Sequence, residues 1–230
     1  MVKIFADGAD KKTMLEAYNN PLIYGLTTNP TLMRKAGISN YKEFAIDILS
    51  EIKDKPISFE VFSDDLIEME KQALEISSWG KNVYVKIPIT NTKSELTYNI
   101  ISNLSEKGVK LNITAITTFD QIKYIPLYNL NGFISIFAGR IADTGIDPLP
   151  IMLKTLNTLK DFPNIELIWA SCREVYNIKQ ADDIGCHIIT VTNDILNKAV
   201  KNLGKDLNDM SLDTVKMFYN DALQSGYTIK

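Results

Sequence analysis

The chain has 230 residues, of which 45% are hydrophobic and 23% charged, with a formal net charge of −3 at pH 7. This length fits one α/β barrel better than two small domains, and the composition is that of an ordinary globular protein. A pI near 5.3 argues against the basic surface that nucleic-acid binding uses. No apolar run reaches the length of a membrane span, so we expect neither a nucleic-acid partner nor a membrane segment.

Eight short apolar segments recur at roughly even intervals, and each is followed by residues with helical periodicity. They span residues 3–7, 24–28, 57–62, 82–88, 110–116, 133–139, 166–171 and 187–192. Strands that are covered by helices on both faces favour a parallel sheet, and eight such units in this length favour closure of the sheet. We therefore predict an α/β fold, a single (β/α)8 TIM barrel domain over residues 1–230.

Helix signals fill the stretches between these segments, most clearly at 63–79, 91–107 and 147–159. No GxGxxG dinucleotide motif and no GxxxxGK[ST] phosphate loop occurs. After the eighth unit, residues 211–226 predict an additional helix, a C-terminal extension with several apolar side chains. This extension either packs beneath its own barrel or reaches a neighbouring subunit.

Cysteine and histidine are scarce, with Cys172, Cys186 and His187 as their full complement. These are too few for the usual Cys/His zinc site, so we expect buried, reduced thiols and no bound metal. The start of the chain goes directly into a strand-like segment and lacks the apolar stretch and cleavage site of a secretory signal. We therefore expect a cytoplasmic protein.

Polar side chains at the carboxyl ends of barrel strands carry the chemistry of this fold class. Lys86 lies within the apolar segment 83–88, where an ammonium group needs either a paired charge or the loss of its proton. It is either a structural lysine bridged to a carboxylate or a nucleophile that forms a Schiff base. Asp7 and Glu60 could move protons beside it, although Asp7 could instead cap the next helix. Asn29 before Pro30 is typical of a helix N-cap, which does not exclude contact with a substrate hydroxyl.

Two arginines follow neighbouring predicted strands. Arg140 comes after the sixth segment, and Arg173 comes after the seventh, close to Ser171. Guanidinium groups suit bidentate contact with phosphate, and barrels of this kind often bind phosphate near the last strands. The alternative is a pair of surface salt bridges to Asp143 or Glu174.

Five motifs, in order along the chain, resemble the signature of the transaldolase family, whose short subfamily also includes the fructose-6-phosphate aldolases. The motifs are GLTTNPTL at 25–32, YVKIPIT at 84–90, LNITAITT at 111–118, SIFAGRIAD at 135–143 and ASCR at 170–173. The resemblance extends from Asp7 to the final helix. Residues 142–147 match the family pattern poorly, which leaves the choice of acceptor open.

The resemblance implies a metal-independent, cofactor-free class I enzyme that acts on sugar phosphates. Its catalytic residues would be the Schiff-base lysine Lys86, the acid/base Asp7, and Glu60 and Thr114, which would hold the catalytic water. Those at the dihydroxyacetone portion of the substrate would be Asn29, Thr28, Asn112, Ser135 and Phe137. Those at the phosphate would be Arg140, Ser171 and Arg173. The resemblance also implies a homo-oligomer, a decamer of two pentameric rings in which the last helix contacts a neighbour.

Two positions separate the activities within this family. The fructose-6-phosphate aldolases carry glutamine where this chain has Glu60 and tyrosine where it has Phe137, so the resemblance favours a transaldolase of the pentose phosphate pathway. The donor would be sedoheptulose 7-phosphate or fructose 6-phosphate, and the acceptor erythrose 4-phosphate or glyceraldehyde 3-phosphate. The alternatives are a fructose-6-phosphate aldolase and a non-catalytic barrel that binds sugar phosphates.

Overall fold

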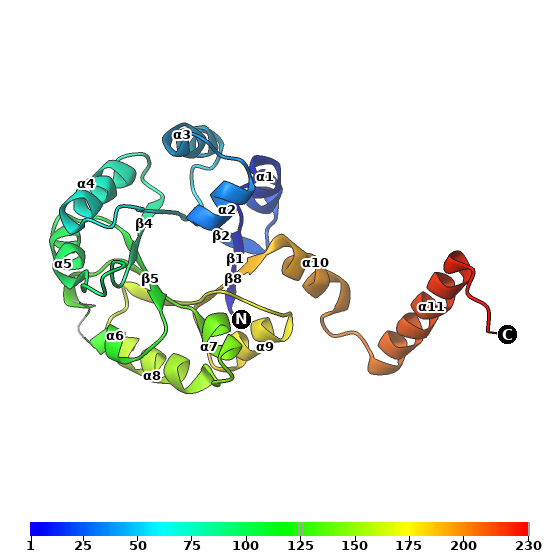
Figure 1. Cartoon of the computed structure of the whole chain (residues 1–230). Helices are drawn as coiled ribbons and strands as arrows, with labels where there is room; N and C mark the ends of the chain where they lie inside the picture. The colour runs from blue at the N-terminus through cyan, green and yellow to red at the C-terminus, as the bar shows by residue number, and fades with distance from the viewer. Residues whose placement is uncertain (124, 126, 230) are drawn as a thin grey trace.

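Eight parallel strands close into a barrel in the order of the sequence, which confirms the predicted (β/α)8 TIM barrel (Figure 1). The computed structural model of the chain describes residues 1–123, 125 and 127–229. Each strand pairs with the next, and β8 pairs with β1. The strands are β1 (Lys3–Asp7), β2 (Ile23–Thr27), β3 (Ile57–Glu60), β4 (Val83–Pro88), β5 (Leu111–Ile116), β6 (Gly132–Ile136), β7 (Ile165–Trp169) and β8 (Ile188–Thr192).

Helices surround the barrel on the outside, and one more helix projects from it (Figure 1). None of the described helices has the length and apolar character needed to cross a membrane. The helical elements are α1 (Lys11–Asn19), α2 (Pro30–Lys35), α3 (Tyr41–Glu51), α4 (Leu66–Ser77), α5 (Tyr98–Glu106), α6 (Asp120–Lys123), the 3-10 turn η1 (Leu127–Asn129), α7 (Ala138–Asp143), α8 (Leu149–Leu159), α9 (Tyr176–Asp183), α10 (Asn193–Asn202) and α11 (Leu207–Ser225).

The strands are apolar along most of their length because one face packs inside the barrel and the other packs against the helices. Ile87 on β4 and Ile113 on β5 are completely buried, as is Phe59 on β3. Polar side chains reach the amino ends of several helices and accept a backbone N–H there. Asp65, for example, accepts from the N–H of Glu68 at the start of α4.

Two predicted boundaries differ clearly from the structure. The helix predicted over 91–107 begins only at Tyr98, because Asn91 holds the preceding loop: its side-chain oxygen accepts the backbone N–H groups of Lys93 and Glu95. The strand predicted over 133–139 ends at Ile136, and its last residues start α7 instead.

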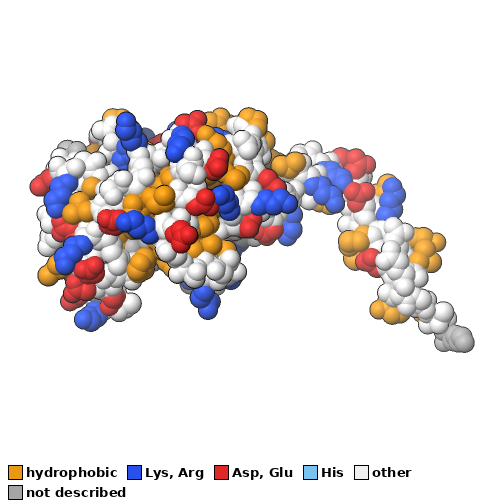
Figure 2. Space-filling view, turned by 90° about the horizontal axis from the view of Figure 1, so that it is seen from above, with side chains coloured by type: hydrophobic (Ala, Val, Ile, Leu, Met, Phe, Trp, Pro, Cys, Tyr) orange, Lys and Arg blue, Asp and Glu red, His pale blue; other side chains and the backbone are white. Residues whose placement is uncertain are grey.

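The C-terminal helix α11 is longer than predicted and starts at Leu207, where Asp206 accepts two backbone N–H groups. None of its residues is buried, and Figures 1 and 2 show it extending away from the barrel. Apolar side chains lie exposed along it (Figure 2). Val215 and Phe218 are among them. The alternative in which this helix packs beneath its own barrel is therefore wrong, and contact with a neighbouring subunit stays a prediction.

Candidate active site

A cavity of about 530 Å³ opens at the carboxyl ends of the barrel strands. The topology alone explains why distant residues meet here, since all eight parallel strands end at this face. Ten of the twelve residues predicted to form the site line the cavity: Asp7, Asn29, Glu60, Lys86, Asn112, Ser135, Phe137, Arg140, Ser171 and Arg173. The structure thus brings them together, while the role of each stays a prediction.

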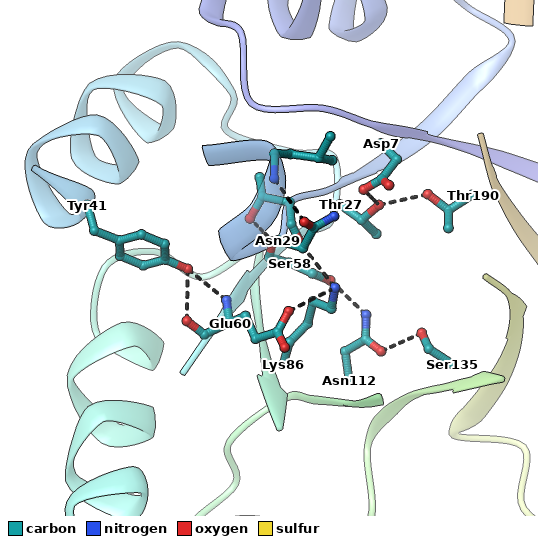
Figure 3. Close-up of polar contacts among 12 residues, drawn as sticks. Asp7, Thr27, Asn29, Tyr41, Ser58, Glu60, Lys86, Asn112, Ser135 and Thr190 are labelled. Atoms are coloured by element: carbon teal, nitrogen blue, oxygen red, sulfur yellow. Dashed lines mark hydrogen bonds and ion pairs between the residues drawn. The ribbon is translucent and has the colours of Figure 1, made fainter. Parts of the chain in front are cut away.

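Lys86 is buried in the wall of this cavity, and its amine faces two oxygen atoms (Figure 3). Its Nζ lies 3.3 Å from Oε2 of Glu60 and donates to the carbonyl oxygen of Thr28 at 3.0 Å. Glu60 and Lys86 are register partners on β3 and β4, so their side chains leave neighbouring strands on the same face. The alternative in which Lys86 forms an ion pair with a carboxylate is therefore met by Glu60, and this ion pair lies in the wall of the cavity.

Asp7 ends β1 at the same cavity, and it does not cap the following helix. Asp10 does so, because its side chain accepts from the N–H of Thr13. Burial raises the pKa of Asp7, while the nearby Lys86 ammonium and the hydroxyl of Thr27 oppose that rise. A raised pKa makes the carboxylate a better proton acceptor than an ordinary aspartate, which suits it to proton transfer.

Two threonines connect to Asp7 in a short hydrogen-bonded chain (Figure 3). Thr27 Oγ1 donates to Asp7 Oδ1 at 2.8 Å and lies 2.7 Å from Thr190 Oγ1. A hydroxyl has one proton, so Thr190 donates to Thr27 whenever Thr27 donates to Asp7. These hydrogen bonds hold the carboxyl group of Asp7 in place. The sequence did not identify either threonine as a neighbour of Asp7.

Asn112 and Ser135 form a polar layer across three strands. Ser135 Oγ donates to Asn112 Oδ1 at 2.7 Å, and Asn112 Nδ2 lies 3.1 Å from Ser58 Oγ. These two contacts orient the Asn112 amide, with its oxygen toward Ser135 and its nitrogen toward Ser58. Ser58 was not predicted as a site residue, although its position two residues before Glu60 on β3 places it on the same face.

Two predicted residues, Thr28 and Thr114, are completely or almost completely buried and do not line the cavity. Thr28 uses its hydroxyl on the carbonyl of Ser58 and contacts Lys86 through its own backbone carbonyl. The hydroxyl of Thr114 has no hydrogen-bond partner among the described residues. A buried hydroxyl in that state is suited to binding a small polar molecule such as water.

Asn29 caps α2, as predicted, because its side-chain oxygen accepts from the N–H of Leu32 at 3.0 Å. Arg173 forms one of the two salt bridges considered as the alternative, the one to Asp143: its Nε lies 3.1 Å from Oδ1 of that residue. This contact lowers the pKa of Asp143. The guanidinium of Arg140 instead lies over the ring of Phe137, 5.7 Å from its centroid. Both arginines still line the cavity, so the ion pair and a phosphate role are compatible.

A glycine brings the two arginine-bearing segments into backbone contact. Gly139, in the first turn of α7, lies so close to the loop after β7 that an added Cβ would be 1.6 Å from the carbonyl oxygen of Ser171. Ser171 itself has a φ of 62°, in the left-handed region. Because Arg140 follows Gly139 directly, this contact holds it close to Ser171 and Arg173. Sequence reasoning placed Gly139 at the end of a strand and missed it.

The cavity also contains residues that carry other chemistry. Lys35 on α2 adds a further cation to its lining. Cys172 lines it too, and burial raises the pKa of its thiol to about 11. Cys172 and Cys186 are both buried and free, as predicted. Within the described ranges, no three His, Cys, Asp or Glu side chains are grouped to hold a metal ion.

Fold and cavity together define a class: a parallel (β/α)8 barrel with a buried lysine and two carboxyl groups at the carboxyl ends of its strands. Residues 4–227 match the family described as Transaldolase/Fructose-6-phosphate aldolase, and the chain belongs to this family. The family is one of transferase- and aldolase-type enzymes.

Relatives with curated names agree with this assignment. The chain is 35% identical to a Dehalococcoides mccartyi protein named "Probable transaldolase", over 85% of this chain and 88% of that protein. A Thermoanaerobacter protein of the same name is 33% identical over 96% of this chain and 98% of its own length. Among solved structures, KGPDC from Streptococcus mutans is similar with a TM-score of 0.58 at 11% identity, covering 85% of this chain and 89% of that one. That likeness concerns the fold alone.

Proposed function

We propose that this protein is a transaldolase that transfers a dihydroxyacetone unit from a ketose phosphate to an aldose phosphate through a Schiff base on Lys86. The observation that carries the proposal is the buried Lys86 amine in a cavity that it shares with Glu60 and Asp7. The donor would be sedoheptulose 7-phosphate or fructose 6-phosphate, and the acceptor erythrose 4-phosphate or glyceraldehyde 3-phosphate. These are substrates of the pentose phosphate pathway, which fits a cytoplasmic protein.

In the first step, the Lys86 amine attacks the ketose carbonyl carbon after its extra proton has passed to a neighbouring base. Glu60 is placed for this transfer, with its carboxylate 3.3 Å from the amine. The carbonyl oxygen takes up protons and leaves as water, and an iminium ion remains on Lys86. A water molecule held between Glu60 and the hydroxyl of Thr114, which has no partner among the described residues, would carry these protons.

In the second step, the bond between the third and fourth carbons of the ketose breaks. Asp7 takes the proton of the hydroxyl on the fourth carbon, the aldose phosphate leaves, and the electron pair of the broken bond neutralises the iminium as an enamine. The raised pKa of Asp7 suits it to hold that proton until the next aldehyde arrives. The enamine then attacks the acceptor aldehyde, Asp7 returns the proton to the new hydroxyl, and hydrolysis frees Lys86.

Phe137 and Glu60 support transfer over simple release of dihydroxyacetone. Phe137 lines the cavity and packs with its ring against the small cluster that contains Phe5 and Phe133. Its phenyl ring offers no hydroxyl that could protonate the enamine, so the enamine survives until an acceptor binds.

The phosphate group of the substrate would bind at Arg140, Ser171 and Arg173, which line the cavity.

Borohydride trapping tests this function directly. Protein mixed with fructose 6-phosphate and borohydride is expected to gain a reduced adduct at Lys86, detected by mass spectrometry of the digested chain. Lys86→Met, which keeps the stem but removes the amine, is expected to fold and to give no adduct and no turnover. Lys110→Met is the matched control, because Lys110 precedes β5 at the opposite end of the barrel. A wild-type protein without an adduct would favour the non-catalytic binder.

A second measurement separates transferase from aldolase. Turnover of fructose 6-phosphate is compared with and without erythrose 4-phosphate. The proposal predicts that turnover depends on the acceptor, whereas acceptor-independent release of dihydroxyacetone as the main product would assign the protein to the aldolases.

The exposed helix α11 supports a further part of the proposal, a homo-oligomer. This helix of 19 residues has no buried residue on the described chain, yet it carries exposed Leu207, Val215, Phe218 and Leu223. A helix in a protein gains most of its stability by packing an apolar face against another surface, and α11 packs on none within the described part of its own chain. A second copy of the chain is the partner that the family resemblance indicates, in a decamer of two pentameric rings.

A further inference from the structure

The pairing between β2 and β3 is short beside Lys86. The two strands are register partners at only two positions, Leu26 with Ile57 and Thr27 with Ser58. The carbonyl of Ser58 accepts a backbone N–H from Thr28, on the β2 side. Glu60, two residues further, directs its own N–H and C=O to that same side, because backbone groups alternate in direction along a strand. These groups lie beyond the end of β2.

Tyr41, the first residue of α3, fills this position with a single hydroxyl (Figure 3). The hydroxyl accepts the backbone N–H of Glu60 at 2.7 Å and donates to the backbone carbonyl of Glu60 at 2.9 Å. It therefore makes the two hydrogen bonds that a neighbouring strand would have made. Burial raises the pKa of Tyr41, so the hydroxyl keeps the proton that it donates.

The ring of Tyr41 is held by aromatic neighbours. It packs edge-on against Phe59, with centroids 6.2 Å apart, and lies 5.9 Å from Trp79 of the α4 to β4 loop. The exposed Phe62 also packs edge-on against it, with centroids 5.5 Å apart. The ring is thus held by packing against aromatic side chains, in which the side chain of Glu60 takes no part.

We infer that Tyr41 is a positioning residue for the reaction: by holding the backbone of Glu60, it sets the position of the carboxylate over the Lys86 amine. The contact between Glu60 Oε2 and Lys86 Nζ is 3.3 Å, and both groups lie in the cavity wall. A small shift of the Glu60 backbone would move the carboxylate away from the Lys86 amine. This inference rests on the proposed Schiff-base function.

Tyr41→Phe tests the inference, because it keeps the ring and removes the hydroxyl. The variant is expected to form the borohydride adduct on Lys86 and to keep its KM for fructose 6-phosphate. Its kcat is expected to fall roughly tenfold to a hundredfold, with a shifted pH profile, because proton transfer depends on close placement of the acid or base. Tyr18→Phe is the matched control, since it removes a tyrosine hydroxyl that bonds Asp54 on the surface.

A double variant shows whether Tyr41 acts through Glu60. If it does, adding Tyr41→Phe to Glu60→Gln leaves kcat and the pH profile of Glu60→Gln unchanged. An unchanged kcat in the single variant, or a further loss in the double variant, overturns the inference. If wild-type protein forms no adduct, the proposed function fails instead.

A second variant covers the case in which Tyr41→Phe does not fold. Incorporation of 3,5-difluorotyrosine at position 41 keeps the ring and the hydroxyl but lets the hydroxyl lose its proton at a lower pH. The fluorinated protein is expected to lose kcat at a lower pH than wild type, because the bond to the carbonyl of Glu60 disappears with that proton. An unshifted profile overturns the inference.

Discussion

The contact between Gly139 and Ser171 allows a specific test of the phosphate site. In Gly139→Ala, the new Cβ would lie 1.6 Å from the carbonyl oxygen of Ser171 and 3.0 Å from Cγ of Arg173. Outside its own residue and the neighbouring residues of the chain, a real Cβ atom essentially never comes closer than 3.0 Å to a heavy atom. The distance to the Ser171 oxygen must therefore grow from 1.6 Å to the limit of 3.0 Å, so the start of α7 and the loop after β7 must separate by about 1.4 Å. This shift moves Arg140 away from Ser171 and Arg173.

The expected effect follows from the size of that displacement. Misplacing a binding group by about 1 Å can reduce catalysis by about 10²-fold, which corresponds to about 2.7 kcal/mol. We expect kcat/KM for fructose 6-phosphate to fall by about this factor in Gly139→Ala. Borohydride trapping of dihydroxyacetone on Lys86 is expected to persist, because dihydroxyacetone has no phosphate and Lys86 lies on β4, away from the altered contact.

Steady-state kinetics and mass spectrometry measure the two effects in parallel. Gly8→Ala is the matched control, since a Cβ at Gly8 would meet no atom within 4 Å. Circular dichroism and thermal melting verify that both variants keep the barrel. An unchanged kcat/KM for fructose 6-phosphate in Gly139→Ala would refute the phosphate assignment. An equal loss of dihydroxyacetone trapping would show that the glycine supports the whole barrel end instead.

Two further predictions concern Asp7 and α11. Burial raises the pKa of Asp7 in the folded protein above its ordinary value of 3.8. The protonated carboxyl group therefore stabilises the fold fully at pH values below 3.8. This contribution is lost as the pH rises through the pKa of the folded state. Asp7→Asn is therefore expected to raise the melting temperature at neutral pH in calorimetry while abolishing turnover, and a lower melting temperature would contradict the buried-charge argument. Removal of residues 206–230 is expected to reduce the particle size in light scattering while the barrel still melts cooperatively. An unchanged size would show that α11 does not join subunits.

Much of this site was accessible from the sequence, because strand ends in a parallel barrel share one face. Asp7, Glu60 and Lys86 each interrupt or end an apolar segment, and closure of the sheet then brings such positions together. The order of the five motifs indicated the family, and the match over residues 4–227 confirms it. Local signals also sufficed for the cap at Asn29, which depends on residues three positions apart.

Other features depend on contacts between segments that are far apart in the sequence. Tyr41 meets the Glu60 backbone, and Gly139 meets the Ser171 carbonyl. A tyrosine at a helix start and a glycine after an apolar strand each have many ordinary explanations, so no local pattern distinguishes them. Their functions exist only after packing fixes which backbone groups face each other.

The sequence by itself determined the alternation of strand and helix, the closed barrel, and which reactive side chains stand at the strand ends, because these follow from hydrophobic periodicity and chain direction. Tertiary structure alone decided that Arg173 pairs with Asp143 and that Thr190 supports Thr27 beside Asp7. It also decided that α11 leaves the barrel rather than packing beneath it. The physical reason is that periodicity specifies which face of an element is buried, whereas the partner on that face depends on the distances and angles at which whole elements pack.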